Sequence, residues 1–524
     1  MKKEKLTEWI KRHKRILKAA IMALLPLLCC LLTCALEGRS LGQIYLPASE
    51  WNDELIYYKQ VEGIVNFGYP QGYFGFNESH SKLLSFAAWS PVLVWPWILW
   101  GLLFGWNLMS PIICNIVLMS LAMFLFVFLV KPTAKQMGIL AVLFVAFKPF
   151  TRYMLSCMPE IICFAMVIVT LALGVNYLER ETRGKLIALF ALTILMTWMR
   201  PYLLVFMLLP IFLWIRRNKW WGVLGSVTVF LFAGAIYIFI KNNLSAEYFL
   251  PLFKTDFVDA LHYSGILGAV KHIVYQLLVK GKEFMAMAIE GYRSGLAAGA
   301  YFDGFMLVLG ILLIQCVYNW RKKQKNQFVI NAYLAVCFTG MWGALLVMYK
   351  LIEGSKHLIT FMAVGVFAIS LMETRFYKKM IVSAAVFVYL YGVLAANHPY
   401  DFANIYQNEE LVAEVEEWKA VFEQELVLVT GDETPNFDNV VVWTLYDYMV
   451  EDGRQVMTKW QPLYGVPAGF GINCCYPDYL VDNYDTLQSK YVVVIPGGTV
   501  EERFADKGVE KVSETEELIL YKLR

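Results

Sequence analysis

The chain has 524 residues, of which 58% are hydrophobic and only 17% charged, and its mean hydropathy is +0.51. This composition excludes an ordinary soluble protein, which cannot bury so much apolar surface. Repeated apolar runs of about 18 residues or more are typical of transmembrane helices. The net charge of +3 says little by itself about binding partners. We expect the chain to contact membrane lipid and not nucleic acid. We therefore predict a polytopic membrane protein.

Apolar runs predict about eleven membrane spans, with boundaries uncertain by a few residues. The spans are expected near 16–36, 107–130, 136–150, 160–178, 185–199, 202–215, 221–241, 304–319, 328–349, 357–373 and 379–396.

Lysine and arginine are concentrated in every second loop between these spans. The basic groups are Lys11 to Arg15, Lys131 with Lys135, Arg180 to Lys185, Arg216 to Lys219, Arg321 to Lys325 and Arg375 to Lys379. Because positive charge accumulates on the cytoplasmic side of membrane proteins, this alternation predicts a cytoplasmic N-terminus. The loops at 37–106, 242–303 and 350–356, and the region from about 397, are then exoplasmic.

Two stretches of these exoplasmic loops are apolar without being predicted to span. The stretch 86–105 contains four tryptophans and two prolines, and counting it as a span would invert every later loop. We expect a helix along the membrane interface.

Residues 266–289 carry Lys271, His272, Lys280 and Lys282 among apolar residues. This segment is either a surface helix whose lysines reach water or a lipid-binding helix.

From about 397 the composition becomes that of a soluble domain. A polar helix is expected at 409–425, followed by strands at 426–429, 440–443, 491–495 and 518–521. Short strands alternating with helical stretches predict a small α/β domain. We therefore divide the chain into a membrane part at 1–396 and an exoplasmic α/β domain at 397–524. Cys474 and Cys475 in that domain are either free thiols or a strained disulfide between neighbours.

Asp53 and Glu54 form an acidic pair in the loop that follows the first span, and Glu160 stands alone at the exoplasmic start of a later one. Positioned carboxylates of this kind deprotonate hydroxyl groups or stabilise developing charge. The alternative for Asp53 and Glu54 is an ordinary solvated loop. The alternative for Glu160 is a helix start, since an acid after a proline faces the positive end of the helix dipole.

These features in order resemble the C-type glycosyltransferase superfamily of membrane enzymes, which includes protein O-mannosyltransferases and aminoarabinose transferases. The resemblance covers about residues 10–400. It is carried by the first span, the Asp53-Glu54 pair, the interfacial tract ending in Phe104-Gly105-Trp106-Asn107, the Met158-Pro159-Glu160 span start and a late Lys356-His357 pair at a span entry. It implies an exoplasmic active site and a helical membrane fold.

The resemblance implies a sugar donor carried on a polyprenyl phosphate and an exoplasmic acceptor. Asp53 is then the candidate catalytic residue, with Glu54 beside it and Glu160 facing the same cavity. A lipid phosphate leaving group needs exoplasmic cations, and arginine binds phosphate oxygens bidentately. The candidates that we expect to bind this phosphate are Arg200, Lys356, Lys82 and Arg152. For Arg200 the alternative is an interfacial side chain reaching lipid head groups.

A divalent metal is left open by the sequence. His80 and His357 are candidates to share a metal with Asp53 and Glu160, but two histidines and two acids spread over three loops do not specify one.

Other functions also stay open. The alternatives are a transporter or lipid flippase, against which the spans hold few charges at mid-depth, and an inactive relative that serves as a scaffold.

The predicted topology is testable by cysteine labelling from outside the cell. We expect an impermeant reagent to modify a reporter cysteine at position 430 and to miss one at position 323, because the first lies in the exoplasmic domain and the second in a basic loop. The opposite pattern would overturn the topology and, with it, the assignment of the acids to the exoplasmic face.

Overall fold

A computed structural model of the chain describes most of the membrane part and most of the C-terminal domain. The described residues are 2–36, 38, 40–43, 53–69, 74–78, 90–244, 256–294, 297–349, 351–372, 409–430, 440–444, 446–458, 460–468, 470–487, 489–505, 507–516 and 518–523. The predicted span at 379–396 and the candidates His80 and Lys82 lie outside them.

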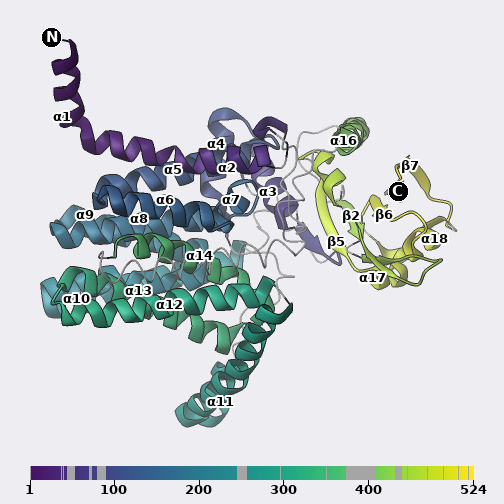
Figure 1. The fold of residues 1–524 in the computed structure, drawn as a ribbon. Helices are drawn as coiled ribbons and strands as arrows, with labels where there is room; N and C mark the ends of the chain where they lie inside the picture. The colour runs from purple at the N-terminus through teal and green to yellow at the C-terminus, as the bar shows by residue number, and fades with distance from the viewer. Residues whose placement is uncertain are drawn as a thin grey trace.

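The membrane part is a bundle of roughly parallel and antiparallel helices, with the C-terminal domain at one end and the N-terminus projecting from the other (Figure 1). Its helices are α1 (Lys2–Ala23), α2 (Leu25–Leu36), α3 (Asp53–Phe67), α4 (Trp95–Phe104), α5 (Ser110–Val130), α6 (Ala134–Ala146), α7 (Pro149–Met154), α8 (Glu160–Glu179), α9 (Arg183–Met199), α10 (Leu208–Leu244), α11 (Asp256–Ser294), α12 (Ala297–Arg321), α13 (Lys325–Met348) and α14 (Leu351–Ser370). Helix α8 is almost entirely buried at the centre of the bundle.

The fold class predicted from composition is confirmed. Among the described residues, six helical stretches are long and apolar enough to cross a membrane. They are His13–Leu36, Ser110–Val130, Glu160–Glu179, Pro201–Leu244, Tyr301–Arg321 and Lys325–Met348. The chain is a multi-pass membrane protein. The number of spans and their orientation stay predictions, because the helices at 134–146 and 356–370 are shorter than a usual span.

The span predicted at 202–215 covers most of the 3₁₀ segment η3 (Pro201–Met207) and the start of α10, and the span predicted at 221–241 falls on the rest of α10. Helix α10 is not one continuous helix. Lys219 has a φ of 44° and interrupts the helical backbone. The chain folds back there so closely that a side chain at Gly222 would lie 2.7 Å from the Ile215 Cα. The hairpin also packs on α9, where the Trp198 Nε1 donates to the Ala233 carbonyl at 3.3 Å. Gly222 is therefore required by the close approach of the two arms.

The tryptophan-rich tract at 86–105 forms only short helices where it is described. A 3₁₀ turn, η2 (Pro91–Val94), leads directly into α4. Trp97 is fully buried and its Nε1 donates to the Asn115 Oδ1 of α5 at 2.8 Å. A helix of ten residues is about 15 Å long, roughly half of a bilayer's hydrocarbon core. The length agrees with the interfacial position, which remains a prediction.

The segment predicted at 266–289 lies within α11, which projects from the bundle (Figure 1). The helical backbone of α11 is interrupted at Gly265, where φ is 65°, so the predicted segment belongs to the second of its two helical parts. Large apolar side chains remain exposed along α11, including Tyr263, Ile266 and Leu278. Both sequence alternatives for this segment stay open.

The C-terminal domain is built on a mixed sheet. Its strands are β2 (Val440–Thr444), β5 (Gly471–Cys475), β6 (Tyr491–Val494), β7 (Glu510–Glu514) and β8 (Ile519–Lys522), with the helices α16 (Glu409–Thr430), α17 (Pro477–Asp482) and α18 (Thr499–Ala505). With β1 (Phe74–Phe76) included, the strand order is β1-β5-β2-β6-β8-β7. A separate hairpin is formed by β3 (Tyr446–Tyr448) and β4 (Gln455–Met457). The predicted α/β character is confirmed.

Strand β1 (Phe74–Phe76) comes from the first long loop, far from the rest of the sheet in sequence. It pairs in parallel with β5, with Phe74 opposite Ile472. The connection is reinforced by Glu78, whose Oε1 accepts from the Ser489 backbone N–H at 2.8 Å. The boundary at 396/397 stays a prediction, but the sheet takes one strand from the N-terminal side of it.

Two details of the C-terminal prediction are decided by the structure. The strand expected at 426–429 is wrong, because these residues continue α16 to Thr430. A short run of apolar residues does not distinguish a strand from the end of a helix. Cys474 and Cys475 are free and buried in β5, so the disulfide alternative is wrong as well.

The α10 hairpin predicts opposite effects for two glycine substitutions. Gly222→Ala should destabilise the protein by about 1–3 kcal/mol, because the new methyl group meets the backbone of the other arm. Gly234→Ala is the matched control, since nothing lies within 4 Å of its Cβ position. There the higher helix propensity of alanine should leave the thermal midpoint unchanged or raised. Equal midpoints for the two variants in detergent would contradict the close approach.

Candidate active site

Helix α3 presents the acidic pair in two different directions. Asp53 and Glu54 are its first two residues, so the expectation that they lie in a loop is wrong. Carboxylates in a first helical turn are stabilised by the positive end of the helix dipole. The Asp53 side chain remains 35% exposed, whereas Glu54 is fully buried. Consecutive helical residues point about 100° apart, which explains why the neighbours have different surroundings.

Asp53 is paired with Lys356 of α14. The Lys356 Nζ lies 2.9 Å from the Asp53 Oδ2, and the two side chains are 27% and 35% exposed. An ion pair that retains this much contact with solvent contributes only modestly to stability and is readily exchanged. The pair therefore offers a carboxylate and an ammonium group, both accessible, at the end of the bundle that carries the C-terminal domain.

Glu160 and Arg200 form a second ion pair that is inaccessible. Glu160 is the first residue of α8, and Arg200 follows the last residue of α9. The Arg200 Nη2 lies 2.8 Å from the Glu160 Oε1, and the side chains are 1% and 0% exposed. Charges so deeply buried are tolerated only when they are paired and hydrogen-bonded.

The other terminal nitrogen of Arg200 connects the pair to η3 (Pro201–Met207) and to α14. The Arg200 Nη1 donates to the Tyr202 hydroxyl at 3.1 Å and lies 3.1 Å from the His357 Nδ1. Because a guanidinium only donates, the His357 Nδ1 must accept, and the imidazole is neutral. The Tyr202 ring packs beside it, with ring centroids 4.8 Å apart.

The two ion pairs are joined by the sequence neighbours Lys356 and His357. One contacts Asp53 and the other contacts Arg200. Tyr57 lies four residues after Asp53, on the same face of α3. Burial raises the pKa of Tyr57, and the charge of Arg200 opposes this shift. The predicted candidates Asp53, Glu160, Arg200, Lys356 and His357 are thus brought together, although their catalytic and binding roles stay predictions.

A different face of α3 contacts the C-terminal domain. The Lys59 Nζ pairs with the Glu62 Oε2 at 2.8 Å and donates to the backbone carbonyls of Tyr464 and Val466. Burial lowers the pKa of Lys59, and Glu62 opposes this shift. The charge of the buried Glu54 contributes to raising the pKa of Tyr464 in the domain and of Cys157 between α7 and α8.

The candidate Arg152 lies on a helix that contributes to neither of the two ion pairs, and some neighbours of the site were missed from the sequence. Arg152 is on α7, half-buried next to Tyr153. Tyr57, Lys59 and Tyr202 were not singled out from the sequence. The spacing of Tyr57 from Asp53 and the position of Tyr202 in Arg200-Pro201-Tyr202 were the available signals. No sequence signal pointed to Lys59, because the carbonyls that it binds lie in the C-terminal domain, far away in sequence.

The described members of the candidate metal set, Asp53, Glu160 and His357, do not fit a divalent cation. Asp53 and Glu160 are each paired with a cation, and the His357 Nδ1 accepts from Arg200. Two positive charges close to the acids disfavour a third cation. In the part of the chain that the structure describes, no three metal-ligating side chains come together. We therefore derive no step through a metal.

The two ion pairs should respond differently to removal of one charge. Glu160→Gln should cost about 3–5 kcal/mol of unfolding free energy, because Arg200 is left buried without its counter-charge. Lys356→Gln should cost about 0–1 kcal/mol, since its pair is partly exposed. Chemical unfolding in mixed micelles measures both. The double variant Glu160→Gln/Arg200→Gln should recover part of the loss, and small equal costs for the single variants would contradict the burial.

Comparison with known proteins gives similarity at the level of structure only. No family model matches the chain, and no curated protein matches its sequence. Two crystal structures of ArnT from Cupriavidus metallidurans align over almost the whole chain. The apo structure has a TM-score of 0.43 and 9% identity, covering 99% of this chain and 98% of that one. The structure bound to undecaprenyl phosphate has a TM-score of 0.40 and 11% identity, covering 96% and 97%. TM-scores and identities this low carry no conclusion about function, which has to be inferred from the site.

Proposed function

We propose that this protein is a membrane glycosyltransferase that moves a sugar from a polyprenyl-phosphate donor to the hydroxyl of an exoplasmic acceptor. The observation that carries the proposal is the accessible Asp53–Lys356 pair. The two side chains lie 2.9 Å apart, and in the proposal Asp53 is the proton acceptor and Lys356 the cation that binds the donor phosphate. The polyprenyl-phosphate donor follows from the family resemblance of the sequence.

The reaction requires one bond to form and one to break at the anomeric carbon of the sugar. The acceptor oxygen forms the new glycosidic bond, and the bond to the phosphate oxygen breaks. Polyprenyl phosphate leaves with the electron pair, and Asp53 takes the proton of the acceptor hydroxyl. A positioned general base supports this transfer because a hydroxyl group is a weak nucleophile until its proton is removed.

Lys356 has a double role in this proposal. Before the donor binds, its ammonium group is held by Asp53 at 2.9 Å. A donor phosphate attracts the same ammonium group and draws it away from the carboxylate. Asp53 is then open to accept a hydrogen bond from the acceptor hydroxyl. Donor binding would thereby prepare the base for the second substrate.

We assign Arg200 a positioning role, which differs from the phosphate contact expected from the sequence. Its side chain is only 1% exposed and is already held by Glu160, Tyr202 and His357. It fixes the start of α14 through His357 and therefore the position of Lys356. Direct contact with a lipid phosphate would require this network to open.

The C-terminal domain is suited to act on the acceptor. Lys59 of α3 donates hydrogen bonds to the Tyr464 and Val466 carbonyls of the domain. The same helix carries Asp53. We propose that the domain caps the cavity or selects the acceptor. A transporter is less well supported, because the two ion pairs lie at helix ends rather than at mid-depth.

Turnover by single-charge variants tests the proposal. Asp53→Asn should lower the rate about 10²–10⁴-fold, because it keeps the shape of the side chain but removes the proton acceptor. Lys356→Gln should chiefly raise the donor KM. The assay incubates the purified protein with a panel of polyprenyl-phosphate sugars and measures the release of polyprenyl phosphate.

A matched control is the surface pair of Lys507 with Asp485, whose atoms lie 3.2 Å apart. Asp485→Asn should leave turnover unchanged. If Asp53→Asn kept near-normal turnover, Asp53 would not be the base, and Glu160 and Glu54 would be the next residues to test.

A further inference from the structure

A pocket with two arginines lies between α9 and the first arm of α10, at the end of the bundle opposite to the ion pairs. Its volume is about 290 Å³, and Arg183 and Arg217 are among the residues that line it. Helix α8 has Glu160 at its first residue and Glu179 at its last, so its ends are roughly 28 Å apart. Helix α9 begins shortly after Glu179. The pocket is therefore separate from the candidate active site.

Both walls of the pocket change from charged to apolar in the same direction. On α9, Ile187 and Phe190 follow Arg183 by four and seven residues, which places the three side chains on one face of the helix. On α10, Trp214 precedes Arg217 by three residues and shares a face with it. Helix α9 starts at this end of the bundle and the first arm of α10 finishes there. Both arginines therefore lie at the outer end, and Phe190 lies about 10 Å deeper along the helix axis.

The apolar floor of the pocket is fixed by packing. The Phe190 and Trp214 rings meet edge to face, with centroids 5.3 Å apart. Phe190 and Leu186 of α9 are buried. A Cβ at Gly225, on the second arm of α10, would overlap the Trp214 ring, so this glycine leaves the space that the ring occupies. The floor thus belongs to a formed pocket that α9 and both arms of the hairpin hold together.

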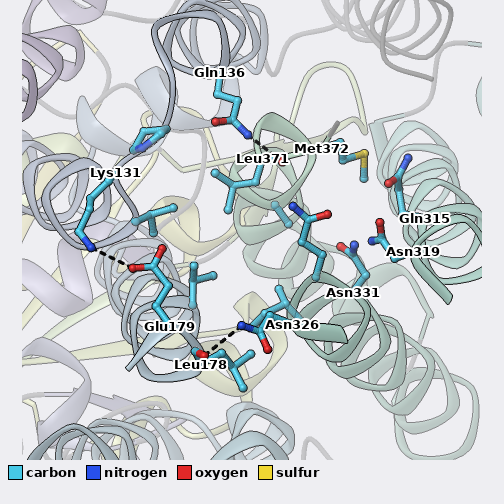
Figure 2. Close-up of a pocket in the computed structure, with 16 residues that line it drawn as sticks. Lys131, Gln136, Leu178, Glu179, Gln315, Asn319, Asn326, Asn331, Leu371 and Met372 are labelled. Carbon is cyan, nitrogen blue, oxygen red and sulfur yellow. Dashed lines mark hydrogen bonds and ion pairs between the residues drawn. The ribbon is translucent and has the colours of Figure 1, made fainter. Parts of the chain in front are cut away.

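Other cations at this end of the bundle are engaged by protein groups. Figure 2 shows Lys131 and Glu179 in a separate cavity, where the Lys131 Nζ lies 2.9 Å from the Glu179 Oε2. Arg216 pairs with Glu181, which lies between α8 and α9. The Lys185 Nζ donates to two backbone carbonyls at the end of α8, at 2.9 Å each. These three cations therefore already have partners within the protein.

The two arginines of the pocket differ in this respect. Glu181 is the only acidic residue in the sequence from 180 to 219. Among the residues that the structure describes, no carboxylate lines the pocket or pairs with Arg183 or Arg217. Guanidinium groups bind phosphate oxygens through parallel N–H groups, and Asn218 adds a carboxamide donor to the lining. The charge and the hydrogen-bonding groups at the mouth of the pocket therefore match a phosphate group.

The apolar surroundings distinguish a lipid phosphate from a free one. The pocket has the volume of on the order of ten water molecules, at about 30 Å³ each, which suits a head group but not two acyl chains. Ile187 is exposed next to the pocket and offers a path for a chain along α9. Trp220 and Trp221 are exposed at the turn of the α10 hairpin. Because tryptophan is enriched at membrane–water interfaces, we infer that the arginines lie at the depth of the lipid head groups.

We propose that this pocket binds the head group of an anionic membrane phospholipid. The phosphodiester would lie between Arg183 and Arg217, and the start of an acyl chain would pack on Ile187 and Phe190. Basic pockets between membrane helices are a recurrent type of site for anionic lipid head groups. A zwitterionic head group would bring a further positive charge to the two arginines, so a net negative lipid is preferred. The inference is independent of the proposed function, because it uses none of the residues near Asp53.

Native mass spectrometry of the full chain in detergent micelles tests the proposal by counting bound lipids. The probes are phosphatidylglycerol, phosphatidylcholine with the same acyl chains, and inorganic phosphate as a competitor. Phosphatidylglycerol should bind at least about tenfold more tightly than phosphatidylcholine, a difference of about 1.4 kcal/mol, and excess phosphate should not displace it. Equal affinities for the two lipids would overturn the proposal. Displacement by phosphate would also overturn it, because the pocket would then be a site for a free anion.

Variants locate the binding to this pocket. Arg183→Gln/Arg217→Gln should abolish the preference for phosphatidylglycerol. The matched control is Arg321→Gln/Lys322→Gln, which removes two exposed positive charges at the end of α12 and should keep the preference. Equal losses in the two double variants would show a general attraction of lipid to basic surface and would contradict a defined site.

The unmodified protein provides a second readout if the double variant fails to fold. A photoactivatable phosphatidylglycerol should label the peptides that contain residues 183–190 and 214–218 more strongly than a photoactivatable phosphatidylcholine does. Equal labelling of these peptides by the two lipids would overturn the proposal.

Discussion

The buried ion pair between Glu160 and Arg200 is the contact on which the candidate site depends. It joins the start of α8 to the end of α9, and the same arginine holds Tyr202 of η3 and His357 of α14. Removing two charges from water is expensive, and the cost is offset only when geometry and hydrogen bonds are good. A pair buried this deeply therefore restricts the relative positions of three parts of the chain.

The position of the Asp53–Lys356 ion pair depends on the Glu160–Arg200 ion pair. Because Lys356 directly precedes His357, fixing His357 against Arg200 also sets where the ammonium group of Lys356 lies. The two cations then differ in what they are able to do. Arg200 is almost fully buried, while Lys356 and Asp53 remain partly exposed. In the proposed function, this exposure is the reason that Lys356 rather than Arg200 exchanges its partner for a ligand.

Helix α3 connects this site to the C-terminal domain. One face carries Asp53 and Tyr57, and another carries Lys59, which binds backbone carbonyls of the domain. The loop after α3 then supplies strand β1 to the sheet. A displacement of the domain would thus be transmitted to Asp53 through a short, rigid helix. In the proposed function, this arrangement is the route by which an acceptor bound to the domain would act on Asp53.

The sequence by itself determined the class of the protein and the identity of several candidate residues. Hydropathy and charge are properties of short stretches of sequence. The membrane helices and the small α/β domain were therefore predictable without knowledge of any tertiary contact. Asp53, Glu160, Arg200, Lys356 and His357 were recognisable because they stand at the ends of apolar segments. The error at 426–429 arose because four apolar residues fit a strand and a helix end equally well.

Only the tertiary structure decided which of these groups meet. Lys356 and Asp53 are 303 residues apart, and Arg200 and His357 are 157 apart. Pairings over such distances depend on how helices pack, which local patterns do not encode. The same holds for the opposite environments of Asp53 and Glu54, for the strand that residues 74–76 add to a distant sheet, and for the meeting of Arg183 and Arg217 at one pocket. Burial is a property of the assembled bundle, and it separates the partly exposed Asp53–Lys356 pair from the buried Glu160–Arg200 pair.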